Sequence, residues 1–191
     1  MFAKFYRNLT ACIVAMWLVG CTSSVEQTIF NRSEAVKARI NLALAYLGQF
    51  DYPKAKENID KAIAHDPNDY LPHSVLAYYF QQIGEQDKAE NTYKQALSLS
   101  QVQGSSHQYD PHILNNYGAF LCKYGRYSEA EQLFTQALES ELPYYHQADT
   151  LENVALCANQ ARDNDRQQQA LTQLEKLEPA RASNLRAKLT P

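Results

Sequence analysis

Histidine is the residue type in this sequence best suited to proton transfer or metal binding, because its imidazole titrates near neutral pH. The five histidines are His65, His73, His107, His112 and His146. None belongs to an HExxH motif, and the sequence has neither a glycine-rich phosphate loop nor a GxSxG motif. A stray metal ion could bind His107 and His112, but solvated loop histidines are the simpler interpretation. The sequence therefore predicts a non-enzymatic protein, with no catalytic residue, metal site, cofactor or small-molecule substrate.

A short apolar run, LTACIVAMWLVGC, ends at Cys21 and follows two basic residues, Lys4 and Arg7. A helix that spans a bilayer needs about 20 apolar residues, and this run is shorter. A basic segment followed by a short apolar run is typical of an export signal. We therefore expect residues 1–20 to be removed and residues 21–34 to form the N-terminal linker of the mature protein.

The apolar run closes with Leu18-Val19-Gly20-Cys21, which resembles the lipobox of bacterial lipoproteins. The resemblance implies that the Cys21 sulfur carries a diacylglycerol and that its freed amino group is acylated, for example with palmitate. Thr22 stands where inner-membrane retention would usually require aspartate, which implies the periplasmic face of the outer membrane. Three acyl chains exceed the two needed for stable attachment to lipid. The alternative is an ordinary export signal that happens to contain a cysteine.

The charge of the chain limits its partners. The sequence has 18 basic and 21 acidic residues, a formal net charge of −3, and removal of Lys4 and Arg7 makes the mature chain more acidic. This balance argues against nucleic acid and anionic lipid surfaces as partners. The mature chain is long enough for one domain with a substantial core.

Three segments repeat one arrangement of small and large residues, beginning at Val36, Tyr70 and Pro111. Nine small residues coincide when the segments are aligned: Ala43, Ala77 and Gly118, then Ala55, Ala89 and Ala130, then Ala62, Ala96 and Ala137. Larger residues also coincide: Leu42, Leu76 and Tyr117, then Tyr46, Phe80 and Leu121, then Ile59, Tyr93 and Phe134. Small side chains allow two helices to cross closely, and large ones fill the space between neighbouring units.

This pattern resembles the tetratricopeptide repeat, a helix-turn-helix unit of 34 residues. The resemblance implies an all-α solenoid, a right-handed superhelix of about four units that begin near residues 36, 70, 111 and 148, within a domain at 35–179. In the fourth unit Gln167 and Leu174 stand where the other units have alanine, which puts close packing there in doubt. Residues 104–110 are predicted to form a surface loop, and residues 180–191 a short capping helix.

The first helix of each unit lines the inner face of such a solenoid, where partners bind. The candidates on this face are Ile40, Leu44, Leu47, Ser74, Tyr78, Gln81, Asn115, Ala119, Cys122, Glu152, Leu156 and Asn159. They make a mixed surface that is apolar at its N-terminal end. Such a groove suits an amphipathic helix or an extended peptide, although any single candidate could instead support packing.

Two cysteines of the mature chain, Cys122 and Cys157, lie in first helices of consecutive units. An exported protein can form disulfides, and neighbouring first helices pack side by side. The register points Cys122 toward the groove and Cys157 toward a neighbouring helix, which could separate their Cα atoms by more than about 7 Å. A disulfide and two buried thiols both remain open.

A closer resemblance lies in residues 115–138, NNYGAFLCKYGRYSEAEQLFTQAL, and 151–163, LENVALCANQARD. Both segments resemble blocks of the type IV pilus biogenesis and stability lipoproteins, the pilotins of the pilus secretin. Longer members of that family carry six repeats, against about four here. The resemblance implies a non-enzymatic outer-membrane lipoprotein that binds secretin subunits and assists their localisation and assembly. It assigns Asn115, Asn116 and Tyr117 to the family motif, with Tyr117 in the core by its register.

A second hypothesis needs the same anchor and scaffold. A tetratricopeptide-repeat lipoprotein of the envelope could instead recruit murein enzymes or other periplasmic complexes. The sequence alone does not separate these two hypotheses.

Overall fold

The computed structural model describes residues 32–102 and 108–189, so the predicted signal, Cys21 and His107 lie outside the described residues. Residues Asn31–Pro191 belong to one compact unit. The described part of this unit forms nine α-helices: α2 (Arg32–Gly48), α3 (Tyr52–His65), α4 (Tyr70–Gln82), α5 (Gln86–Leu99), α6 (Pro111–Lys123), α7 (Tyr127–Leu138), α8 (Gln147–Ala161), α9 (Asn164–Leu177) and α10 (Pro179–Leu189). Within the same ranges the only β-type pairing is an isolated bridge between Gln101 and Tyr109. No helix there is long and apolar enough to cross a membrane.

Aspartates begin several of these helices. The side chain of Asp51 accepts a hydrogen bond from the backbone N–H of Lys54 at the start of α3, and Asp110 accepts one from His112 at the start of α6. Both α3 and α6 have a proline in the first turn, where a missing N–H leaves no hydrogen bond unmade. These caps explain why the helices start where they do.

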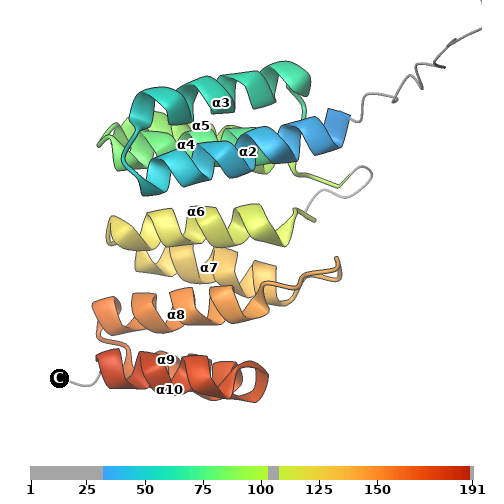
Figure 1. Cartoon of the computed structure of the whole chain (residues 1–191). Coiled ribbons are helices and arrows are strands. Elements are labelled where there is room, and N and C mark those ends of the chain that lie inside the picture. Colours follow the sequence, from blue (N-terminus) through green and yellow to red (C-terminus); the bar gives the residue numbers. More distant parts are fainter. Residues whose placement is uncertain (1–31, 103–107, 190–191) are drawn as a thin grey trace, which may run out of the picture. The chain divides into compact units, whose positions relative to one another are not determined.

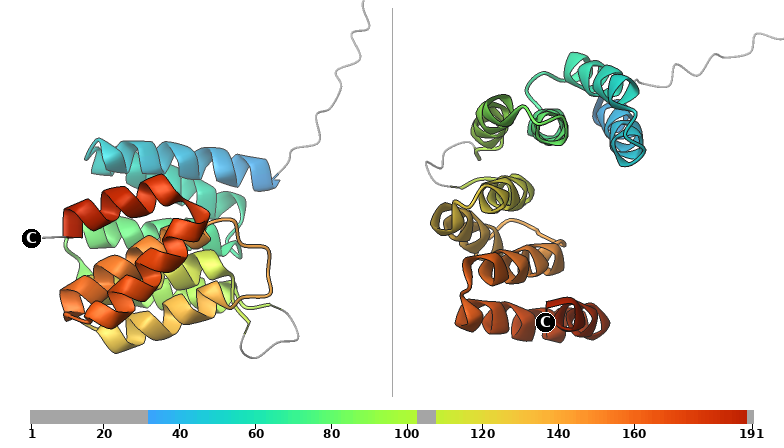
Figure 2. Two further views of the ribbon diagram at one scale, coloured as in Figure 1. Left: turned by 90° about the horizontal axis from the view of Figure 1, so that it is seen from below. Right: turned by 90° about the vertical axis from the view of Figure 1, so that its left-hand side faces the viewer.

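The helices form four pairs, α2/α3, α4/α5, α6/α7 and α8/α9, and each pair contacts the next (Figure 1). The first helices α2, α4, α6 and α8 also contact one another in that order, and α10 packs on α8 and α9 (Figure 2). This confirms the predicted fold class, an all-α tetratricopeptide-repeat solenoid that ends in a capping helix.

The nine aligned small residues are all buried. Eight of them are alanines with at most 1% of their surface exposed, and the ninth is Gly118. Each lies where the two helices of a unit cross or where neighbouring units meet. A larger side chain would push those helices apart.

The core is divided within α4. A small cluster joins α2, α3 and Val75 of α4, while a larger one runs from Ala77 of α4 to Leu185 of α10. The larger cluster includes Leu174, which is fully buried, and Gln167 is also buried. The fourth unit is therefore closely packed despite its departure from the alanine pattern, because α10 covers Leu174 with Ala182 and Leu185.

One aligned residue of the first unit does not follow the others. Leu42 is 45% exposed, whereas its equivalent in the third unit, Tyr117, is buried against Tyr93 of the preceding second helix. Within the described residues no second helix precedes α2. The outer side of α2 therefore presents Leu42 where later units have an interface.

Candidate functional site

A cavity of about 380 Å³ lies along α4, between α2 and α6. Its lining residues are Leu44, Leu71, Ser74, Val75, Tyr78, Gln81, Tyr93, Asn116 and Ala119. Five of them were predicted on the inner face, and none carries a charge. The structure thus brings together Leu44, Ser74, Tyr78, Gln81 and Ala119 from three successive first helices.

One buried aromatic residue, Tyr93, lines this cavity. Tyr93, which comes from the second helix α5, is 2% exposed and stacks on Tyr117 with ring centroids 5.6 Å apart. Burial raises the pKa of the Tyr93 phenol, so its hydroxyl stays protonated and donates to Gln81 Oε1 at 3.5 Å. Leu44 and Tyr78 are 43% and 38% exposed and form the rim. Sequence reasoning placed Tyr93 in the packing register but missed its place in the cavity.

A second cavity, of about 270 Å³, lies on the other side of α6. Its lining residues are Ala119, Cys122, Lys123, Asn153, Leu156 and Gln160. Ala119 belongs to both cavities, so the two meet at a small side chain. We call the two cavities together the inner groove.

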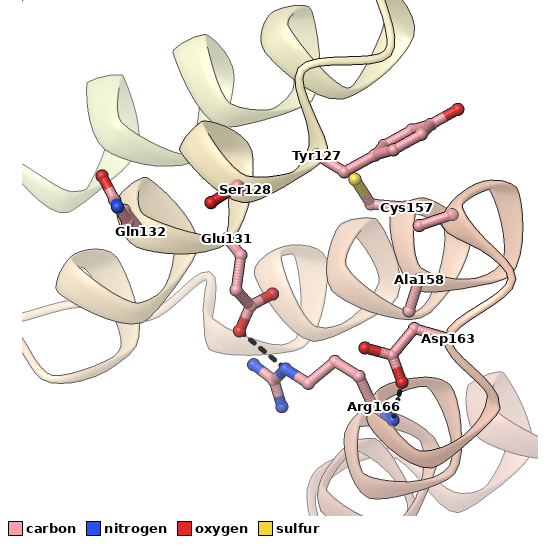
Figure 3. Close-up of a pocket in the computed structure, with 9 residues that line it drawn as sticks. Tyr127, Ser128, Glu131, Gln132, Cys157, Ala158, Asp163 and Arg166 are labelled. Atoms are coloured by element: carbon pink, nitrogen blue, oxygen red, sulfur yellow. Dashed lines mark hydrogen bonds and ion pairs between the residues drawn. The ribbon is translucent and has the colours of Figure 1, made fainter.

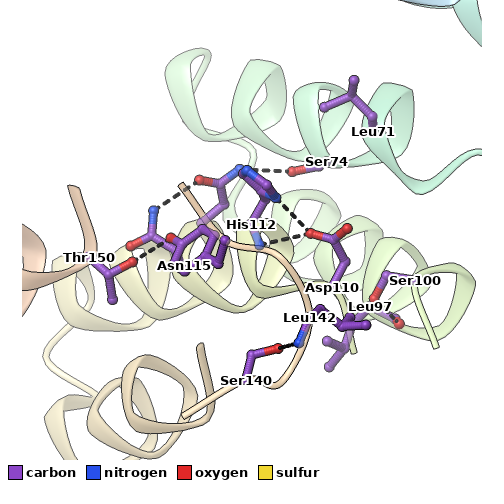
Figure 4. A network of polar contacts seen from close by, with 12 residues as sticks. Leu71, Ser74, Leu97, Ser100, Asp110, His112, Asn115, Ser140, Leu142 and Thr150 are labelled. Carbon is purple, nitrogen blue, oxygen red and sulfur yellow. Dashed lines mark hydrogen bonds and ion pairs between the residues drawn. The ribbon is translucent and has the colours of Figure 1, made fainter. Parts of the chain in front are cut away.

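A ladder of polar side chains links three of the helices that line the inner groove, α4, α6 and α8 (Figure 4). Asn116 Nδ2 donates to Ser74 Oγ at 3.2 Å, which joins α6 to α4. Asn153 Nδ2 donates to Asn115 Oδ1 at 2.9 Å, which joins α8 to α6, and Asn115 donates to Asn116 at 3.4 Å. Two adjacent asparagines of the family motif therefore hold three first helices in register.

Several candidates for the inner face lie elsewhere. Ile40 and Leu47 are 2% and 5% exposed, because they pack against α3 in the small core cluster. Their assignment to a partner-binding surface is therefore wrong. Asn115 is also buried and acts between helices, and Glu152 forms an ion pair with Arg181.

The remaining three candidates for the inner face, Asn159, Cys122 and Leu156, each line a cavity. Asn159 is exposed, but it lines a cavity formed by α8, α9 and α10. Cys122 and Leu156 both line the inner groove.

Cys122 and Cys157 form a disulfide between α6 and α8. Their Cα atoms are 5.7 Å apart, within the usual range for a disulfide. The larger separation suggested by their register is therefore not found. Cys122 lines the inner groove, while Cys157 lines a cavity of about 350 Å³ between α7, α8 and α9 (Figure 3). Arg166 and Glu131 also line the cavity that contains Cys157, and they form an ion pair there with Arg166 Nε 2.7 Å from Glu131 Oε1.

The described histidines have structural partners. His73 lies buried in α4 and donates to the Pro67 carbonyl at 3.0 Å, so its interpretation as a solvated loop residue is wrong. His112 and His146 each contact an aspartate, and their rings are 5.1 Å apart. The described residues include no group of three or more metal-ligating side chains placed to hold an ion.

Two models of the tetratricopeptide repeat match the sequence, one over residues 36–69 and one over residues 73–141. The chain belongs to the tetratricopeptide-repeat family. Folds of this family are typical of scaffolds that bind other proteins.

Relatives of this tetratricopeptide-repeat protein include an uncharacterized protein of Haemophilus influenzae, which is 42% identical over 176 residues, 92% of this chain and 93% of the relative. The type IV pilus assembly protein PilF of Pseudomonas aeruginosa is 33% identical over 160 residues. That match covers 82% of this chain but only 60% of PilF.

Solved structures agree with these relationships. The structure of Pseudomonas aeruginosa pilF superposes with a TM-score of 0.66 at 30% identity, covering 82% of this chain and 70% of that one. The structure of PilW, a type IV pilus biogenesis factor, superposes with a TM-score of 0.63 at 27% identity, covering 75% and 62%. The resemblance to pilus biogenesis proteins seen in the sequence is confirmed by these relatives.

Proposed function

We propose that this protein is a lipid-anchored scaffold in type IV pilus biogenesis, which binds secretin subunits in its inner groove and assists their localisation and assembly. The observation that carries the proposal is the uncharged cavity built by three successive first helices. Its size suits a large apolar side chain from a partner, with Leu44 and Tyr78 at the rim. The relationship to PilF and PilW supports the pilus as the setting.

The proposed anchor is the lipobox cysteine, Cys21, on the periplasmic face of the outer membrane. Acyl chains on Cys21 would hold the scaffold at the membrane where a secretin ring assembles. The protein would act by binding and positioning, without a chemical step of its own.

A matched pair of substitutions tests the groove. Leu44 and Leu42 lie in the same helix and are similarly exposed, but only Leu44 lines the cavity. We would purify full-length protein from detergent-extracted membranes, as wild type, Leu44→Ser and Leu42→Ser, and quantify the co-purified secretin by mass spectrometry. Leu44→Ser should lower secretin recovery about tenfold, and Leu42→Ser should leave it unchanged.

Cys21→Ser tests the anchor in the same experiment. Loss of acylation should move the protein out of the outer-membrane fraction while the isolated protein still binds secretin. Recovery of murein enzymes without secretin would contradict the proposal and favour the second hypothesis. Equal secretin recovery by Leu44→Ser and wild type would exclude the inner groove as the binding site.

A further inference from the structure

The inner groove has an uneven distribution of charge. Its larger cavity is lined by no charged residue, and its smaller cavity by one, Lys123. The chain as a whole is acidic, with a formal net charge of −3. Lys123 is therefore the single charged residue of a groove that is otherwise lined by uncharged side chains.

The charge of Lys123 is not neutralised within the described part of the chain. Its ammonium group lies 6.0 Å from the centre of the Tyr124 ring, and no ion pair to a carboxylate forms there. The two acidic residues of α8, Asp149 and Glu152, both pair with Arg181, and neither lines the cavity that contains Lys123. Lys123 is exposed and thus available to a carboxylate from outside the chain.

Two amide side chains, Asn153 and Gln160, line the same small cavity as Lys123. Amides and an ammonium group can all donate hydrogen bonds to a carboxylate. The small cavity is therefore suited to an acidic side chain, whereas the large cavity is suited to an apolar one. Lys123 lies four residues beyond Ala119, where the cavities meet, which is about 6 Å along the helix.

We infer that the segment held in the inner groove carries a large apolar side chain for the first cavity and an aspartate or glutamate for Lys123. The two cavities share Ala119 and lie on opposite sides of α6, so the apolar and the acidic side chain belong to one segment that crosses α6 at Ala119. This inference rests on the proposed function and names the chemistry of the bound segment.

The test uses charge reversal in the full-length, membrane-extracted protein. Lys123→Glu should lower recovery of the bound secretin about tenfold, since it replaces an attractive pair with a repulsive one. Lys176→Glu makes the same charge change on the exposed surface of α9, and should leave recovery unchanged. Raised salt should weaken binding by the wild type more than binding by Lys123→Gln.

A charge swap then identifies the partner residue. A photo-crosslinking amino acid in place of Gln160, which lines the same cavity, would mark the bound segment for mass spectrometry. Replacing the acidic residue of that segment by lysine should restore binding to Lys123→Glu. Unchanged binding by Lys123→Glu together with loss by Leu44→Ser would overturn this inference and leave the proposed function intact. If both variants bind as the wild type does, the groove assignment itself fails.

Discussion

Gly118 of α6 lies directly against the ring of Phe134 in α7, so closely that an ideal Cβ on Gly118 would stand 2.7 Å from Phe134 Cε1. Phe134 is fully buried. The equivalent residues of the first two units are Ala43 and Ala77, which face Ile59 and Tyr93 in their own second helices. The third unit thus has glycine at this position, which leaves space for the larger ring of Phe134.

Gly118→Ala should destabilise the protein by about 1–3 kcal/mol, because overpacking forces a shift of a buried ring. Chemical denaturation followed by circular dichroism would measure the change. Gly48→Ala is the matched control, since a Cβ there meets nothing within 4 Å. A loss at Gly118 no larger than at Gly48 would show that Phe134 can move.

The turns between paired helices adopt a left-handed backbone at one residue each. Gly84 and Gly125 have φ of 81° and 75°, and Phe50 takes the equivalent place in the first unit with φ of 59°. Gly84→Ala should cost about 1 kcal/mol through steric strain. Phe50→Ala should change stability by less than about 0.5 kcal/mol, because that exposed position already holds an L side chain. Thermal melting of both variants would test this: a lower melting temperature for Gly84→Ala than for Phe50→Ala would show that the added Cβ at Gly84 causes the strain.

The disulfide between Cys122 and Cys157 spans 35 residues and should stabilise the third and fourth units. Loop-closure entropy for such a span corresponds to about 3–4 kcal/mol. Reductant should therefore lower the melting temperature of the wild type and leave the Cys122→Ser/Cys157→Ser variant unaffected. Two free thiols in protein prepared without reductant would contradict the bridged form.

Glu90 of α5 should make stability depend on acid pH. Hydrogen bonds from Arg126 and Lys94 lower the pKa of its carboxyl to about 2, well below its usual range. Because the folded pKa is lowered, the stabilisation is present above about pH 5 and disappears as the pH falls toward 2. Glu90→Gln should remove about 1 kcal/mol at neutral pH, since the pair lies near solvent.

The change in unfolding free energy with pH tests whether Glu90 is the group responsible. Between pH 5 and 2, Glu90→Gln should lose less stability than the wild type in urea titrations. Glu139→Gln alters an exposed carboxylate with no ion pair in the described ranges, and should leave the slope unchanged. Equal slopes for the wild type and Glu90→Gln would argue against the lowered pKa.

Much of the fold could be predicted from small residues alone. Residues such as Ala55 and Ala62 mark helix crossings through a steric requirement that does not depend on distant parts of the chain. The capping prolines and glycines act just as locally. The helix pairs and their order therefore followed from the repeat pattern.

The inner face was predicted only in part, because it depends on small rotations of each helix. Ile40 and Leu44 are one turn apart in α2, yet Ile40 is buried and Leu44 lines the cavity. The contribution of Tyr93 comes from a second helix that reaches between two first helices, which the register of first helices does not reveal. His73 was misjudged because its partner, the Pro67 carbonyl, is a backbone group.

The division of the core within α4 should make the two ends of the array open at different rates. The helices α2 and α3 share a small cluster with Val75 of α4, without the disulfide and without a covering helix among the described residues. In a stack stabilised mainly by nearest neighbours, such an end opens before the rest. Backbone amides of α2 should therefore exchange with solvent deuterium sooner than those of α6 and α8. Leu44 lies on α2, so this groove residue should belong to the part of the array that opens first.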